Sequence, residues 1–145
     1  MGGPKFGCRN RTLHIILNLI LTNLSQKTPK WVFARVAAIE TICTILLNYS
    51  EFEQKFFENF CWSELFDCLC QATDDYTTTT NGDIGRFTRR AAIQTIGKLL
   101  PLAFNKQKGN LPVISQNQLD LAIGKIIERA CESIDDLRVV RVFFF

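Results

Sequence analysis

The chain has little of what metal or nucleic-acid binding requires. It contains a single histidine, His14, and none of its six cysteines forms a CxxC pair. The usual zinc sites need Cys and His ligands at such spacings, so no metal site is expected. No run of five or six basic residues occurs and the net charge is only +3, so no nucleic-acid partner is expected.

A membrane span is missing as well. The apolar stretch "LHIILNLILTNL" at positions 13–24 is shorter than the roughly 20 residues that cross a bilayer. It is followed by an amphipathic helix and not by a small-residue cleavage site, which argues against a secretory signal. We therefore expect no membrane insertion.

The sequence also lacks the motifs of a nucleotide or calcium site. After "NGDIG" at 81–85 there is no lysine, as a phosphate-binding P-loop would require. With Gly82 at the turn position, an EF-hand would need acidic side chains where Thr77 and Thr88 stand. No nucleophile–base pair can be assigned around His14. We therefore expect a binding protein with no cofactor, and not an enzyme.

The six cysteines that are present lie mostly among apolar neighbours, where a free Cys behaves as a small hydrophobic residue. We interpret them as reduced core residues of a cytoplasmic protein, with disulfides as the alternative.

Apolar residues recur at steps of three and four along most of the chain, which indicates helices. Pro29, the pair Ser50/Glu53, Ser63 and the pair Ser115/Gln118 mark helix starts. The predicted helices cover positions 9–25, 30–48, 51–60, 63–73, 85–104 and 115–133. The predicted fold class is all-α.

Two of these helices repeat one another. "FARVAAIETICTILL" at 33–47 and "FTRRAAIQTIGKLL" at 87–100 match at a 54-residue offset. The identical pairs are Phe33/Phe87, Arg35/Arg89, Ala37/Ala91, Ala38/Ala92, Ile39/Ile93, Thr41/Thr95, Ile42/Ile96 and Leu46/Leu100. A third copy begins at Asp135, where Asp-x-x-Arg-x-x-Arg repeats the spacing that starts at Asp83.

The repeated pattern resembles the second helix of a HEAT repeat. Its acidic residue suits a helix N-terminus, its arginine can bond to a neighbouring pair, and its alanines allow close helix approach. Such hairpins bury their apolar faces only against the next hairpin. We predict one domain, 1–145, forming a HEAT-like α-solenoid fragment of about two and a half hairpins. The repeats would cover about 9–48, 63–104 and 115–145, with a short extra helix at 51–60. Three phenylalanines replace the expected small residues at the end, so we expect the last repeat to be truncated.

The threonine-rich stretch "DDYTTTTNGDIGR" at 74–86 admits two interpretations. It can be the inner turn of a helical hairpin, with Asp83 capping the next helix. Alternatively, that helix N-terminus and Arg86, Arg89 and Arg90 could attract an anion.

The same stretch resembles tubulin-folding cofactor D (tubulin-specific chaperone D). The matching residues are Asp75, Tyr76, Thr77, Gly82, Asp83, Ile84, Gly85, Arg89 and Ala92, and a second patch matches at Glu132, Ile134, Asp135 and Arg138. Phe87 stands where that family usually has Trp, and Arg90 stands where Glu is common. The resemblance covers only a small part of that large solenoid, near its end.

This resemblance implies a chaperone of post-chaperonin tubulin folding in the cytoplasm, associated with the microtubule cytoskeleton. The implied partners are β-tubulin, cofactors E and C and an Arf-like small GTPase, with a contribution to activating GTP hydrolysis within the complex. The candidate residues for structure or partner contact are Tyr76, Thr77, Asp83, Arg86, Arg89 and Arg90. A generic HEAT-repeat scaffold unrelated to tubulin, or an inactive fragment, is the alternative.

Overall fold

The structure is a computed structural model that describes residues 32–49, 60, 62–104, 107–108, 111–112 and 114–132, together with Ile15, Leu19, Ile20 and Thr22. All but the last residue of the predicted helix at 51–60, most of the predicted helix at 9–25 and the third copy of the repeat lie outside these residues.

The described chain is mostly helical, as predicted. Its long helices are α2 (Val32–Tyr49), α4 (Trp62–Ala72), α5 (Gly85–Phe104) and α6 (Gln116–Ala130). Two small antiparallel hairpins connect them: β1 (Thr78–Thr79) with β2 (Gly82–Asp83), and β3 (Gln107–Lys108) with β4 (Leu111–Pro112). The all-α prediction is therefore confirmed for these helices.

Helix starts follow the local sequence closely. Helix α5 begins and ends at the predicted residues. Helix α6 has the predicted capping box: Ser115 Oγ accepts the Gln118 backbone N–H at 3.2 Å, and the Gln118 side chain accepts the Ser115 N–H at 3.3 Å. The prediction that Ser63 caps α4 is wrong, because the helix already begins at Trp62. The Ser63 hydroxyl instead accepts a 2.7 Å hydrogen bond from Gln118 of α6, a tertiary contact that local sequence could not reveal.

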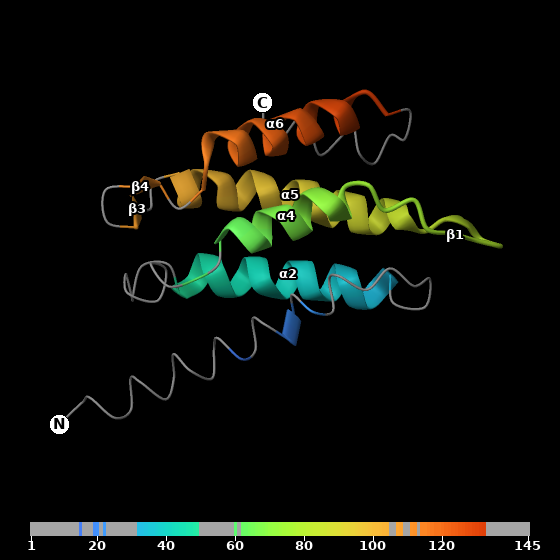
Figure 1. Ribbon diagram of the computed structural model, residues 1–145. Helices are drawn as coiled ribbons and strands as arrows, with labels where there is room; N and C mark the ends of the chain where they lie inside the picture. The colour runs from blue at the N-terminus through green and yellow to red at the C-terminus, as the bar shows by residue number, and fades with distance from the viewer. Residues whose placement is uncertain are drawn as a thin grey trace.

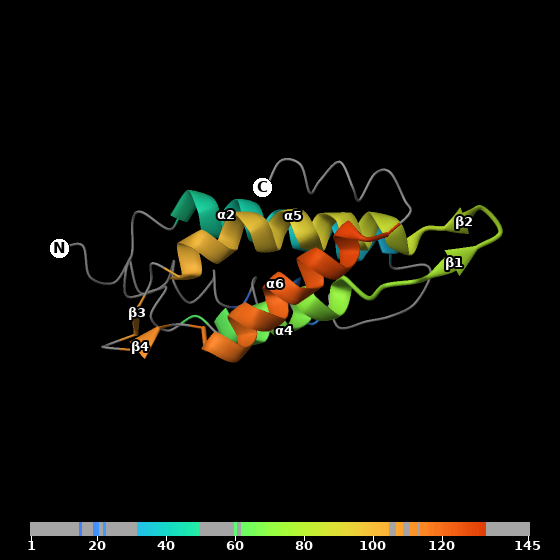
Figure 2. The same cartoon turned by 90° about the horizontal axis from the view of Figure 1, so that it is seen from above.

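The sequence predicts no regular structure between α4 and α5 or between α5 and α6. Each of these two connections contains a short β-hairpin. In the first, Thr78 pairs with Asp83 and Thr79 with Gly82. Threonines favour extended backbone, and Gly82 adopts a φ of +100°, which suits glycine. This hairpin projects beyond the ends of the helices (Figure 2).

The helices form two layers. Helix α2 lies beside α5 in one layer, and α4 lies beside α6 in the other (Figures 1 and 2). Helices within a layer run in the same direction, and the two layers run in opposite directions, as the colours of Figure 1 show. The starts of α2 and α5 and the ends of α4 and α6 therefore meet at one edge, from which the β1–β2 hairpin extends.

Small and branched apolar residues fill the space between these helices. Ala91 and Ala92 of α5 are 4% and 0% exposed, which allows α5 to lie close to its neighbours. The largest fully buried apolar side chains are Trp62, Phe66, Ile39, Ile42, Leu46, Leu65, Leu69, Ile96 and Leu99. They come from α2, α4 and α5, and α6 adds Ala122 and Ile126 to the same core. In the part of the chain that the structure describes, no helix combines the length and apolar character needed to cross a bilayer.

Candidate functional site

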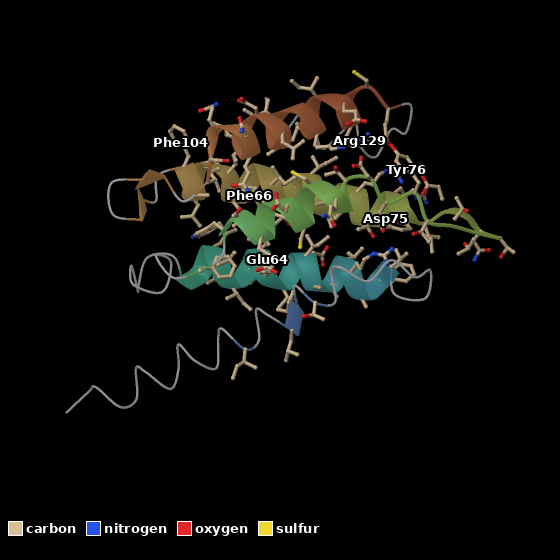
Figure 3. The ribbon with its side chains drawn as sticks, viewed as in Figure 1. Glu64, Phe66, Asp75, Tyr76, Phe104 and Arg129 are labelled. Atoms are coloured by element: carbon tan, nitrogen blue, oxygen red, sulfur yellow. The ribbon has the colours of Figure 1, made fainter. Side chains whose placement is uncertain are left out.

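The helix edge that carries the β1–β2 hairpin gathers most of the buried charge of the described chain. Figure 3 shows Asp75 and Tyr76 close to Arg129 at this edge, with Phe104 at the opposite end of α5. We call the residues that bond here the edge cluster: Arg35, Asp75, Tyr76, Thr77, Asp83, Arg89, Arg129 and Glu132.

Glycine at position 85 lets the hairpin close onto α5. The Gly85 N–H donates to the Thr77 carbonyl at 2.9 Å, so the chain after α4 lies directly against the first turn of α5. A Cβ atom at Gly85 would lie 2.2 Å from the Asp75 carbonyl oxygen and 2.7 Å from the Thr77 nitrogen. No side chain fits there, which fixes the position of Asp75 relative to α5.

Asp75 lies in the segment between α4 and β1 and bonds this segment to α2. Its Oδ2 accepts hydrogen bonds from Arg35 Nε at 3.1 Å and Nη2 at 2.6 Å, while Oδ1 accepts from the Thr77 N–H at 3.1 Å and hydroxyl at 2.5 Å. Arg35 is 2% exposed. A buried guanidinium that meets a carboxylate through two nitrogens is a strong and directional contact.

Arg89 of α5 bonds to the same segment and to the hairpin. It is completely buried, and its Nη1 donates to the Asp75 carbonyl at 2.6 Å and to Asp83 Oδ1 at 3.2 Å. Its Nη2 donates to Asp83 Oδ2 at 2.7 Å and lies 3.6 Å from a carboxylate oxygen of Glu132, after α6. One side chain thus joins the end of α4, the hairpin and the end of α6.

Tyr76 covers Arg89 from outside. The Arg89 and Arg129 guanidinium carbons lie 4.4 Å and 5.4 Å from the centroid of its ring, and its hydroxyl donates to Glu132 at 2.7 Å. Arg129 bonds to the same carboxylate. Stacking of cations on a tyrosine ring is attractive and excludes water from the guanidinium.

Helices α4 and α6 are also joined directly. Lys125 Nζ lies 2.6 Å from Asp74 at the end of α4, and the Gln118 side chain donates to the Ser63 carbonyl at 3.1 Å at its start. These polar contacts fix the register of the two parallel helices.

The hydrogen bonds shift the acidity of both aspartates. Burial raises the pKa of Asp75, but hydrogen bonds from Thr77 and Arg35 outweigh burial and hold it below the usual 3.8. The hydrogen bond from Arg89 lowers the pKa of Asp83, burial opposes it, and the backbone N–H groups of Arg86 and Gly85 lower it further. Asp83 is therefore the ion partner of Arg89 at the start of α5.

These shifts predict acid sensitivity. A carboxylate with a lowered folded-state pKa stabilises the fold above its unfolded pKa, and this stabilisation is lost as pH falls through the folded value. The free energy of unfolding should thus be constant near neutrality and fall below about pH 5. Urea denaturation at a series of pH values from 7 to 3 measures the free energy of unfolding as a function of pH. Asp83→Asn should show a shallower decline, and an unchanged profile would contradict the role of Asp83.

The edge cluster joins α2, α5, α6 and the segment after α4 through hydrogen bonds and ion pairs. Among the described residues, no group of three or more His, Cys, Asp or Glu side chains is placed to hold a metal ion.

Cys43, Cys68, Cys70 and Cys131 are free thiols. Burial raises the pKa of Cys43 and Cys68, and that of Cys70 to about 11, so these three thiols are poor nucleophiles. His14 lies outside the described residues.

The structure separates the candidate residues named from sequence into two groups. Tyr76, Thr77, Asp83 and Arg89 lie together in the edge cluster. Arg86 and Arg90 are exposed on α5, away from it. The anion interpretation of this helix start loses support, because the Asp83 carboxylate lies beside it and Arg89 is buried among carboxylates. Whether any of these residues contacts a partner remains a prediction.

The candidate residues named from sequence did not include four members of the edge cluster: Arg35, Asp75, Arg129 and Glu132. Arg35 could have been found, because it occupies the same repeat position as Arg89. Asp75 and Glu132 were indicated only by the resemblance, and Arg129 carries no comparable signal, since its contacts depend on how α6 stacks on α4.

No family model matches the chain, and no solved structure matches it significantly.

Proposed function

We propose that this chain is part of a HEAT-like α-solenoid that binds protein partners. The observation that carries the proposal is that two arginines at the same position of the 54-residue repeat, Arg35 and Arg89, make similar contacts. Arg35 of α2 bonds to Asp75 at the end of α4, and Arg89 of α5 lies beside Glu132 at the end of α6. In both cases an arginine at the start of one helix reaches an acidic residue at the end of the following antiparallel helix.

The layered arrangement also supports stacked hairpins. Parallel helices within each layer and opposite directions between layers are what consecutive helical hairpins produce when they stack. Solenoids built in this way present extended surfaces for proteins and need no catalytic pocket.

More specifically, we propose a tubulin-folding chaperone role of the cofactor D kind, in the cytoplasm. The residues that carry the resemblance include Asp75, Tyr76, Thr77, Asp83 and Arg89, and all five belong to the edge cluster. This supports a shared architecture around that cluster. The implied partners, β-tubulin, cofactors E and C and an Arf-like GTPase, rest on the resemblance alone.

A scaffold unrelated to tubulin is the second candidate. One observation favours it: the matching residues bond mainly to one another, so the same cluster would serve any solenoid regardless of its partner.

A pull-down separates these two functions. We expect the immobilised, purified chain to retain β-tubulin or the Arf-like GTPase, while an unrelated helical-repeat protein of similar size retains neither. Circular dichroism on the same sample must show a helical, cooperatively melting chain. A folded chain that retains neither partner would contradict the tubulin-specific proposal and leave the general scaffold in place.

A further inference from the structure

The two helix layers carry opposite charge. Helices α2 and α5 together contain five Arg or Lys residues and one carboxylate, Glu40, whereas α4 and α6 contain two Arg or Lys residues and four carboxylates. Net charge of one sign on a surface attracts partners of the other sign.

Only three of the five cations in the α2/α5 layer can meet a partner. Arg35 and Arg89 are buried and form ion pairs within the edge cluster. Arg86, Arg90 and Lys98 are exposed, and none of them forms an ion pair with any residue that the structure describes. Among the described residues, these three exposed cations therefore have no ion partner of their own.

These three cations share one face of α5. At 3.6 residues per turn they fall within about a third of the helix circumference, and Arg86 and Lys98 are about 18 Å apart along the axis. An extended peptide rises about 3.3 Å per residue, so about six residues would follow the whole row.

An aromatic pair lies at one end of this row. Phe33 of α2 is 67% exposed, and its ring centroid lies 6.0 Å from that of Phe87 on α5. The Arg86 guanidinium carbon lies 4.9 Å from the Phe87 ring centroid. An exposed aromatic surface beside cations suits a segment with an apolar residue next to its acidic ones.

We propose that the exposed face formed by Phe33, Phe87, Arg86, Arg90 and Lys98 binds an acidic segment of a partner protein, with an aromatic residue at the Phe33 end. This inference goes beyond the proposed function, because it depends only on charge and exposure and does not require the partner to be tubulin. Nucleic acid is a poorer match. Three cations neutralise few phosphates, and the two phenylalanine rings pack on each other instead of offering a free stacking platform.

The test measures binding of a fluorescein-labelled phenylalanine–hexaglutamate peptide to the full chain by fluorescence anisotropy. The double variant Arg90→Gln/Lys98→Gln should weaken binding by about three- to tenfold, as expected for loss of two exposed ion pairs. Phe33→Ala should weaken it by about threefold through loss of the aromatic contact. Binding should also weaken as ionic strength rises.

The matched control is Gln71→Glu/Asn117→Asp. It lowers the net charge by the same two units, but on exposed positions of α4 and α6. If it weakens binding as much as Arg90→Gln/Lys98→Gln, the attraction is unspecific and the proposal is overturned. Absence of binding to the wild-type chain, equal affinity for a phenylalanine–hexalysine peptide, or tighter binding of a thymidine oligonucleotide would overturn it as well. Because the probes are synthetic, such a failure is distinguishable from failure to retain tubulin.

Discussion

Replacing Arg89 with alanine is expected to lower the free energy of unfolding by about 3–5 kcal/mol. The arginine is fully buried, so the substitution leaves Asp83 and the Asp75 carbonyl without their donor and opens a cavity under Tyr76. The Asp83 side chain keeps 30% of its surface exposed, so we expect most of the cost from the cavity that a fully buried side chain leaves and from the Asp75 carbonyl that loses its donor. Urea denaturation followed by circular dichroism measures the loss.

Two variants make the Arg89 test specific. Arg90→Ala changes the neighbouring, exposed arginine and should alter stability by no more than about 0.5 kcal/mol. Arg89→Lys keeps the charge but loses the planar guanidinium that donates to Asp83 and to the Asp75 carbonyl together. Its free energy of unfolding should therefore lie between those of Arg89→Ala and the wild type. Equal stabilities of Arg89→Ala and Arg90→Ala would show that the edge cluster does not hold the fold together.

Replacing Gly85 with alanine should destabilise the protein at the upper end of the roughly 1–3 kcal/mol typical of overpacking. The added methyl group would lie 2.2 Å from the Asp75 carbonyl oxygen, and backbone is the least able to move. Separating the loop from α5 would lengthen the 2.9 Å Gly85–Thr77 bond and pull Asp75 away from Arg35. The expected result is a lower denaturation midpoint together with a weaker coupling between Arg35 and Asp75.

Gly124→Ala is the matched control. Gly124 lies inside α6 with nothing within 4 Å of the position of an added Cβ. Alanine there should stabilise the chain by about 0.5–1 kcal/mol, because glycine loses more backbone entropy in a helix. Gly85→Ala should therefore lower the free energy of unfolding, and Gly124→Ala should raise it. A neutral Gly85→Ala would contradict the close approach of the hairpin to α5.

Local signals in the sequence accounted for the helices. Periodic apolar residues and the Ser115/Gln118 capping box act within one or two turns, so the bounds of α5 and the start of α6 could be read directly. The Ser63 cap was wrong because its hydroxyl is used by Gln118, a residue 55 positions away.

The sequence indicated only part of the edge cluster. The spacing from Asp83 to Arg89 is local, and the two residues do bond to each other. Asp75 was noticed only through a resemblance, and its bond to Arg35 spans 40 positions. Such a pair forms only when α2 and α5 have stacked and the hairpin has closed.

The sequence by itself determined where the described helices lie, which of their faces are apolar and that α2 and α5 are copies of one pattern. The reason is that helix formation, capping and periodicity depend on residues within a few positions of each other. Only the tertiary structure decided that Arg89 is buried while the adjacent Arg90 stays exposed, that the guanidinium groups of Arg89 and Arg129 both lie near the Tyr76 ring, and that one layer of helices is basic and the other acidic. These properties arise from the register in which whole helices pack, and that register is set by the summed contacts of residues far apart in the chain.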